Sequence, residues 1–400
     1  MRHRLRKRRL HSVRRSASAG RAKRRIGRVL RGWMPGLLLV PGLCLGPVDP
    51  GFAEESNDSV PGTTEDAADP RWTGPLTAQW QHDLGRSIEH PLILNEGALI
   101  VTTTDRRIVS LDLATGKRHW RRRFKEDIPV PPALLPADDP AGRVVVFHGR
   151  PEDGRLRLLD GRTGKDLWSL DWKSRPVHLS GNRDRVWLLL QNGKLLGLST
   201  SDGKKEWEVR DLGWDSPSFA DDGETLFVLE RSDSLHAFDG DDGTRSWSIA
   251  LAGRFAAPPT ITGNTLLVVN TTGTLWEIDR ESGAILGSSR RVPGQLTPPV
   301  PSADRIVTAA ASGVVESRDL AGEGWSFESG EALESVPVPA GPIILLGTSG
   351  GELLALRTDR GELAWSLDLK SRFKTAPLVT DRFLVLATSS GDIYVYQHDS

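Results

Sequence analysis

Residues 76–400 are patterned as short apolar runs separated by turns rich in glycine, asparagine, aspartate and serine. Residues 258–287 are representative. A Gly263-Asn264 turn precedes the apolar run 266–269, and a turn at Gly273 precedes the alternating segment 274–278. Continuous apolar runs are typical of strands buried on both faces, and alternation indicates a half-buried strand. With the strand that follows the Gly283 turn, the pattern predicts four antiparallel strands per unit.

One segment recurs along the chain at a nearly constant spacing. Clear copies are LDLATGKRHW (111–120), LDGRTGKDLW (159–168), LSTSDGKKEW (198–207) and FDGDDGTRSW (238–247), and weaker copies end at Gly287, Trp325 and Trp365. The steps between these ends are 48, 39, 40, 40, 38 and 40 residues. A period of about 40–45 residues with several strands per unit predicts propeller blades. The third strand occurs eight times, starting near residues 107, 155, 193, 234, 273, 313, 351 and 391. We therefore expect an all-β, eight-bladed propeller.

The last unit reaches the C-terminus without an outer strand of the Trp-ending type. A strand of that type lies at the other end of the repeats, at residues 76–84. We expect this strand to pair into the last blade, because closure of this kind removes exposed sheet edges.

The recurring tryptophan predicts a structural role, since a large indole at one place in each blade packs most simply between neighbouring blades. This position in the seam between blades is expected for Trp80, Trp120, Trp168, Trp207, Trp247, Trp325 and Trp365.

The N-terminal region has a different composition. Residues 1–32 hold 14 Lys or Arg and no acidic residue, and a short apolar stretch at 33–46 follows. This order, with Ala53 before an acidic segment, predicts a basic signal or targeting segment at 1–53. A nucleic-acid-binding arm is the alternative. Residues 54–75 are polar and turn-rich, which predicts an acidic flexible linker.

Charge and cysteine content change once the segment 1–53 is set aside. The whole chain has 52 basic and 52 acidic residues, whereas 54–400 has 38 and 51, a net charge of −13. An acidic exported domain argues against a nucleic-acid partner. Cys44 is the single cysteine, so the remaining chain has no disulfide. Leu43 precedes it where lipoprotein signals prefer a small residue, which disfavours a lipid anchor at Cys44. Periplasmic or envelope localisation and peripheral membrane association are both compatible with this pattern.

The LD-x-x-TGK-x-x-W repeat resembles the PQQ-like, quinoprotein-type propeller repeat over roughly residues 76–400. That family includes quinone-dependent dehydrogenases and BamB-type scaffolds of outer-membrane protein assembly. In size and closure the chain is more similar to the BamB type. This resemblance implies an exported, non-catalytic, monomeric scaffold with an envelope protein as partner and no cofactor.

Two other functions remain open: a PQQ- and calcium-dependent oxidoreductase, and a sensor for a small ligand or polysaccharide. The dehydrogenases of the family use a calcium site and, in many members, a disulfide of adjacent cysteines. The most calcium-like segment here, 239–243, has Gly243 where a ligand is needed. The histidines show no i, i+4 metal spacing, and no nucleophile motif occurs. We therefore assign no catalytic, cofactor-binding or metal residues.

A group of basic residues suggests a binding surface. The connections after four consecutive outer strands carry basic side chains, whereas the connection after Trp325 carries Glu328, Glu331 and Glu334. A basic arc on an acidic protein predicts a rim for an acidic partner or an anion; ordinary solvated loops are the alternative. The predicted rim comprises Arg86, Lys125, Lys173, Arg175, Lys370, Arg372 and Lys374.

Overall fold

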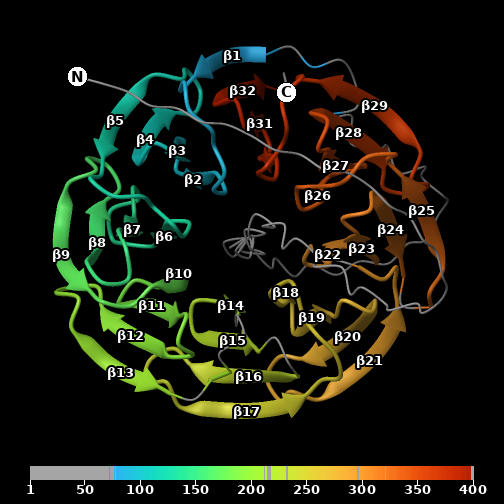
Figure 1. Cartoon of the computed structure of the whole chain (residues 1–400). Coiled ribbons are helices and arrows are strands. Elements are labelled where there is room, and N and C mark those ends of the chain that lie inside the picture. The colour runs from blue at the N-terminus through green and yellow to red at the C-terminus, as the bar shows by residue number, and fades with distance from the viewer. Residues whose placement is uncertain are drawn as a thin grey trace, which may run out of the picture. The chain divides into compact units, whose positions relative to one another are not determined.

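The computed structural model describes residues 72, 76 and 78–397, except 211, 214–217, 231, 232, 295, 296 and 320. The predicted signal segment 1–53, Cys44 and almost all of the predicted linker 54–75 lie outside these residues. The described residues form eight four-stranded antiparallel sheets arranged as a ring (Figure 1). The prediction of an all-β, eight-bladed propeller is confirmed.

The strands nearest the ring axis are short except β10, and their side chains are mostly half-buried. They are β2 (Ile93–Asn95), β6 (Ala133–Leu135), β10 (Pro176–Gly181), β14 (Ser218–Asp221), β18 (Thr260–Thr262), β22 (Val300–Ser302), β26 (Val338–Ala340) and β30 (Leu378–Val379).

The second strands carry the continuous apolar runs of the sequence and are almost wholly buried. They are β3 (Ala98–Thr103), β7 (Arg143–His148), β11 (Arg185–Leu190), β15 (Thr225–Leu229), β19 (Thr265–Val269), β23 (Arg305–Ala309), β27 (Ile343–Gly347) and β31 (Phe383–Ala387).

The third strands are also largely buried. They are β4 (Arg107–Asp112), β8 (Gly154–Asp160), β12 (Leu195–Ser199), β16 (Ser234–Asp239), β20 (Thr274–Asp279), β24 (Val314–Arg318), β28 (Glu352–Arg357) and β32 (Asp392–Gln397).

The outer strands alternate between exposed and half-buried residues, as expected for strands with one face in water. They are β5 (Arg118–Arg123), β9 (Asp166–Trp172), β13 (Lys205–Val209), β17 (Arg245–Ala250), β21 (Ile285–Arg290), β25 (Gly324–Glu328), β29 (Leu363–Asp368) and β1 (Ala78–Asp83). Blades 1 to 7 are β2–β5, β6–β9, β10–β13, β14–β17, β18–β21, β22–β25 and β26–β29, and blade 8 is β30–β32 with β1.

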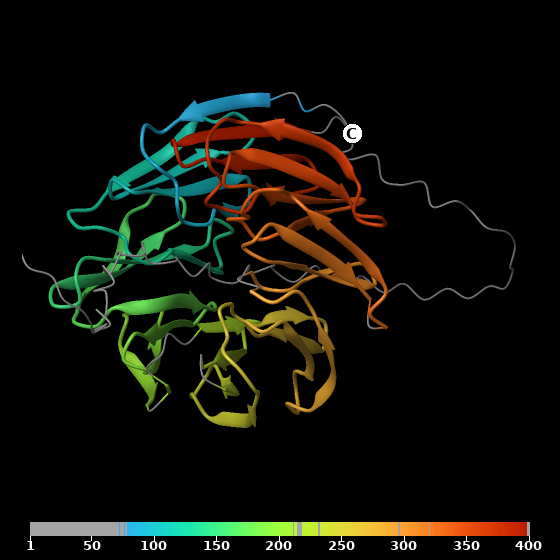
Figure 2. The ribbon, with the colours of Figure 1, turned by 45° about the vertical axis from the view of Figure 1, so that its right-hand side comes forward.

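Blade 8 joins the two ends of the described chain. Strand β1 pairs antiparallel with β32, with His82 opposite Ile393 and Asp83 opposite Asp392. Figures 1 and 2 show β1 beside β32 at the outside of the ring. The predicted closure by residues 76–84 is therefore confirmed.

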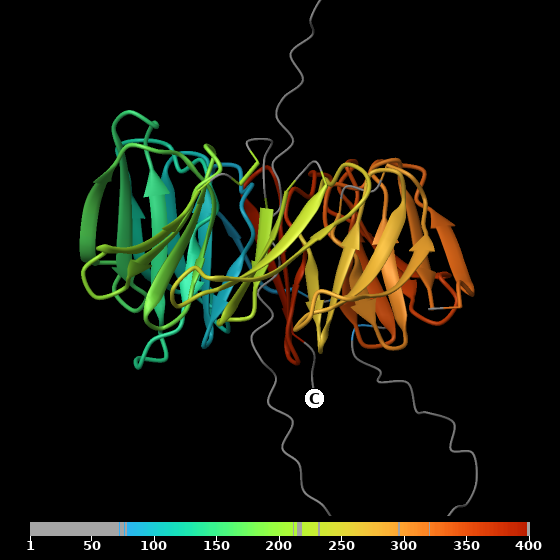
Figure 3. The ribbon, with the colours of Figure 1, turned by 90° about the horizontal axis from the view of Figure 1, so that it is seen from below.

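Apolar side chains pack between the blades. Figure 3 shows the sheets side by side around the ring. Eight buried apolar clusters occur in the described residues, and each contains residues of two adjacent blades. The seam between blades 5 and 6 has the smallest cluster: Leu267, Val269, Leu275 and Ile306.

The outer-strand tryptophans reach across these seams in one direction. Trp120 is typical: its indole Nε1 donates to the Gly161 carbonyl of the next blade at 2.9 Å. A Cβ added to Gly164 would lie 2.6 Å from the same ring, which explains why glycine occupies this turn. The equivalent donations run from Trp80 to Leu113, Trp168 to Thr200, Trp207 to Gly240, Trp247 to Arg280 and Trp325 to Thr358.

Blade 8 has no turn between its third and outer strands, so Trp365 of blade 7 finds another partner. Its indole Nε1 donates to the backbone carbonyl of Trp72 at 2.7 Å. The Trp72 side chain is only 4 % exposed and belongs to the apolar cluster of blades 7 and 8. Trp72 therefore differs from the flexible segment predicted at 54–75, because its indole and carbonyl complete the last seam.

Candidate functional site

One end of the ring is formed by two sets of connections. The first runs from each outer strand to the next blade, and the second joins the second and third strands of each blade. The two sets touch: Phe124 donates its backbone N–H to the Arg106 carbonyl at 2.8 Å, and Ile88 forms an isolated bridge with Thr103. We call the end formed by these connections the loop face.

The seven residues of the predicted rim all lie on the loop face, in the connections after β29, β1, β5 and β9. Six of them are exposed, and Lys374 is half-buried. These four connections are neighbours around the loop face, because β29, β1, β5 and β9 belong to consecutive blades of the closed ring.

Two of the rim cations are already paired with carboxylates of a neighbouring connection. Lys374 Nζ lies 2.8 Å from Glu89 Oε1, and Arg372 pairs with Glu334. Glu334 belongs to the connection after β25, so the acidic connection borders the basic arc directly. Among the described residues, no ion pair involves Lys125, Lys173 or Arg175, and these three remain available to a partner.

A polar cluster of one buried, two half-buried and one exposed residue lies between blades 1 and 2. Arg157 donates from Nε to His148 Nε2 at 2.8 Å and from Nη1 to Asp166 Oδ2 at 2.7 Å. Arg122 reaches the same carboxylate oxygen at 2.7 Å. Burial and the neighbouring Arg157 lower the pKa of His148 to about 4. His148 is therefore a neutral acceptor that helps to hold Arg157 in place.

A cavity of about 420 Å³ lies along the seam between blades 3 and 4. Leu212 and Phe238 form part of its apolar wall, and Arg210 also lines it. His236 Nε2 lies 3.1 Å from Glu230 Oε1 inside it. This histidine–carboxylate pair is the most catalysis-like arrangement of the described residues. The Nδ1 atom of His236 is buried and has no hydrogen-bond partner among the described residues.

Two titratable residues of the inner strands have shifted pKa values. Burial raises the pKa of Asp221 to about 6, although Ser180 donates its hydroxyl to Asp221 Oδ2 at 2.6 Å. Burial lowers the pKa of His178 to about 4, and its ring stacks on Phe219 with centroids 4.0 Å apart. Perturbed groups of this kind also occur in purely structural networks, so they do not by themselves define a site.

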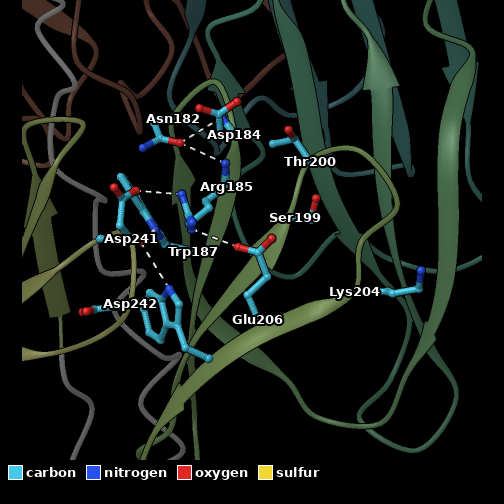
Figure 4. A network of polar contacts seen from close by, with 12 residues as sticks. Asn182, Asp184, Arg185, Trp187, Ser199, Thr200, Lys204, Glu206, Asp241 and Asp242 are labelled. Carbon is cyan, nitrogen blue, oxygen red and sulfur yellow. Dashed lines mark hydrogen bonds and ion pairs between the residues drawn. The ribbon is translucent and has the colours of Figure 1, made fainter.

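The opposite end of the ring carries a polar network between blades 3 and 4 (Figure 4). Arg185 bridges the seam, with Nη1 2.7 Å from Asp241 Oδ1 and Nε 2.9 Å from Glu206 Oε2. Below it, the buried Trp187 donates to the Gly240 carbonyl at 2.9 Å. The network fastens one blade to the next.

No group of three or more His, Cys, Asp or Glu side chains that could hold a metal ion occurs among the described residues. In the same part of the chain, no helix is long and apolar enough to cross a membrane.

The buried and half-buried polar residues of the third strands were missed from the sequence, although a signal for them exists. One third-strand position lies directly before the residue that pairs with the outer-strand tryptophan. In three blades this position holds a polar or charged residue: Arg157, His236 and Glu316. In other blades it holds Val109, Leu196 or Leu354. Aligning the repeats strand by strand would have shown a charged or polar residue in an otherwise apolar column.

Comparison with protein families gives a match along the whole propeller. A family model described as outer membrane protein assembly factor BamB matches residues 75–210, 209–323 and 311–400.

Curated relatives align over shorter stretches. The outer membrane protein assembly factor BamB of Bordetella pertussis is 29 % identical over 117 residues, which are 27 % of this chain and 27 % of that protein. The quinohemoprotein alcohol dehydrogenase ADH IIB of Pseudomonas putida is 28 % identical over 115 residues, 26 % of this chain and 16 % of that protein. The aligned part therefore spans about a quarter or less of these relatives.

Solved structures show the same fold. BamB from Moraxella catarrhalis superposes with a TM-score of 0.69 at 19 % identity, covering 81 % of this chain and 100 % of that chain. Quinohemoprotein alcohol dehydrogenase from Comamonas testosteroni gives a TM-score of 0.60 at 14 % identity, covering 80 % of this chain and 76 % of that chain.

Proposed function

The chain belongs to the family of the outer membrane protein assembly factor BamB, and from this membership we propose that it is a non-catalytic scaffold of the cell envelope that binds another envelope protein. The observation that carries the proposal is the family match, which runs through residues 75–400 and so covers every blade. The basic segment 1–53, which precedes the acidic remainder of the chain, supports export.

The loop face is the surface that we assign to the partner. Lys125, Lys173 and Arg175 project from two consecutive connections and have no carboxylate partner in the described part of the molecule. Exposed cations of this kind attract an acidic surface and orient it during encounter, more than they add to final affinity. The proposed partner surface is therefore acidic.

Charge reversal tests this assignment. The variant Lys125→Glu/Lys173→Glu/Arg175→Glu should lose an envelope partner that co-purifies with the tagged wild type, and association should weaken most at low salt. The matched control is Lys117→Glu/Arg118→Glu/Lys165→Glu. Lys117 and Lys165 directly precede β5 and β9, and Arg118 is the first residue of β5. All three are exposed and lie at the end opposite the loop face. Equal retention of the partner by both variants would contradict the rim.

A quinone-dependent oxidoreductase is the second candidate, because the similarity to the Pseudomonas putida dehydrogenase covers 115 residues. The described residues do not fit a calcium–quinone site, since no cluster of three or more carboxylate, histidine or cysteine side chains occurs among them. Incubation with PQQ and calcium followed by dye-linked oxidation of alcohols and sugars distinguishes the two candidates. Sustained turnover would favour the enzyme.

A further inference from the structure

The outer strand of blade 1 carries a pair of cations that no other blade repeats. Arg121 and Arg123 stand one and three residues after the tryptophan position, and both are exposed. No ion pair involves either of them among the described residues. The same two positions of the other blades hold Gln81 and Asp83, Ser169 and Asp171, Glu208 and Arg210, Ser248 and Ala250, Ser288 and Arg290, Ser326 and Glu328, and Ser366 and Asp368.

These two arginines and the exposed Lys125 lie at alternate positions of the chain. The residues next to them, Trp120 and Arg122, donate from their side chains to backbone carbonyls of blade 2. Side chains alternate between the two faces of a strand, so Arg121 and Arg123 project from the opposite face, roughly 7 Å apart. Lys125 continues this spacing just beyond the end of β5, on the loop face.

Strand β5 also has a free backbone edge. It is the terminal strand of its sheet and lies on the outside of the ring (Figure 1). Just after β5, Phe124 donates its backbone N–H to the Arg106 carbonyl of the same blade. Because hydrogen-bonded pairs alternate along an antiparallel ladder, the N–H and carbonyl groups of Arg121 and Arg123 point away from β4. Residues 78–210 are described without a gap, and no described residue bonds to this edge.

The charges on this edge select among the segments that could pair with it. An exposed edge is a template for another strand, and charged side chains on it repel a neighbour of like charge. A second copy of β5 would place arginine opposite arginine and is therefore disfavoured. A strand with carboxylates at alternate positions would instead place an acid beside each cation, and arginine can hold a carboxylate through two hydrogen bonds.

We propose that β5 receives an extended acidic segment of the envelope partner as a fifth strand of blade 1. Main-chain hydrogen bonds to Arg121 and Arg123 give affinity, and the side chains of these residues select carboxylates. Lys125 belongs both to this edge and to the loop face, so the proposal rests on the acidic partner proposed above and assigns a strand as its form. The edge begins at Trp120, because a bulge separates it from Arg118.

A synthetic peptide tests this pairing on the full chain. The probe is fluorescein-labelled Thr-Glu-Val-Glu-Val-Glu-Thr-amide, and we expect saturable binding by fluorescence anisotropy. Hydrogen–deuterium exchange of the complex should be slower at residues 120–124, because the N–H groups of Arg121 and Arg123 gain acceptors. If saturating peptide leaves exchange in this segment unchanged, the proposal is overturned.

Substitutions on two strands test the role of the arginines. Arg121→Glu/Arg123→Glu should bind the probe at least about tenfold more weakly, whereas Arg121→Lys/Arg123→Lys should keep most of the affinity. The matched control is Ser288→Glu/Arg290→Glu, which changes the same two exposed positions on β21 and should bind like the wild type. Equal binding by both Glu variants would place the peptide elsewhere and refute the assignment.

Two altered peptides separate strand pairing from charge alone. Thr-Val-Glu-Glu-Glu-Val-Thr-amide has the same charge but cannot present its three glutamates on one face. The original sequence with N-methyl groups on two adjacent central residues loses one donor on each edge. Each should bind at least about tenfold more weakly than the probe, and equal binding would show that charge attraction suffices and would overturn the added strand.

The other occupants give different outcomes. Sedimentation of the wild type and binding to anionic phospholipid vesicles test a second copy and a membrane. A dimer, or vesicle binding, that Arg121→Glu/Arg123→Glu abolishes while the probe leaves exchange at 120–124 unchanged would assign the edge to that occupant and refute the acidic strand.

Failure of this inference is distinguishable from failure of the loop face. If Lys125→Glu/Lys173→Glu/Arg175→Glu loses the co-purifying envelope partner but Arg121→Glu/Arg123→Glu retains it, the loop face stands and the added strand is refuted. If the first variant retains the partner while the second loses it and the probe slows exchange at 120–124, the strand stands without the rim.

Discussion

The closure of the ring at Trp72 can be tested by removing one side chain. The Trp72 indole is 4 % exposed and lies in the cluster that joins blades 7 and 8. Replacing a buried tryptophan by alanine costs about 3–5 kcal/mol, because transfer free energy is lost and a cavity remains. Trp72→Ala should therefore lower the free energy of unfolding by about that amount, measured from the urea midpoint of intrinsic fluorescence and circular dichroism.

Truncation tests the contribution of the Trp72 carbonyl together with that of its side chain. Chains that begin at residue 54 or 71 should unfold at the same urea concentration, because both retain Trp72. A chain that begins at residue 76 loses the indole and also the acceptor of the Trp365 Nε1 bond, which adds about 1 kcal/mol. If the chain beginning at 76 is as stable as the one beginning at 71, Trp72 does not close the ring and the reasoning is refuted.

Three further predictions concern single positions. Burial holds the pKa of His148 near 4. The unfolded chain therefore takes up a proton on this histidine at about pH 6.5 and the folded chain does not, so the free energy of unfolding falls as the pH drops from about 6.5 to 4. His148→Gln should remove one proton from the slope of unfolding free energy against pH in that window. Arg291 is 5 % exposed and its guanidinium nitrogens make no hydrogen bond among the described residues, so Arg291→Leu should raise the thermal midpoint, and a lower midpoint would show that the charge is stabilising. Gly164→Ala should destabilise the protein more than Gly322→Ala: both glycines have positive φ, of 67° and 89°, but only at Gly164 does a Cβ meet an indole, so equal losses in calorimetry would argue against seam packing.

The periodic part of the fold was predictable because each repeat has the same order of apolar runs and turn residues. Apolar runs such as 266–269 indicated the buried second strands, and the orphan strand at 76–84 indicated how the ring closes. Positions that depart from the repeat were harder, because their meaning depends on the neighbouring blade. Arg291 occupies the position of Phe124 and Leu251 in other blades. In each case the backbone N–H donates to a carbonyl in the connection between the second and third strands of the same blade.

The candidate surface was predictable only in part. Exposure and order around the loop face follow from the strand order, and the sequence placed all seven rim residues there. The pairing of Arg372 with Glu334 could not be predicted, since it joins connections 38 residues apart through side-chain geometry alone. Trp72 was missed because the residues around it in the sequence are polar. Its carbonyl accepts from Trp365 only because blade 8 has no turn between its third and outer strands.

The one-way reach of each outer-strand tryptophan into the following blade has a consequence for how the number of repeats is fixed. Such a contact joins the front of one unit to the back of the next, and head-to-tail contacts of this kind close only when successive rotations complete a full circle. The angle set at each seam, rather than the length of the chain, therefore dictates eight units. Duplication of a whole repeat would leave an open spiral with two unpaired edges, so this chain can change its size during evolution by lengthening loops, as blade 2 does between β6 and β7, far more readily than by adding a blade.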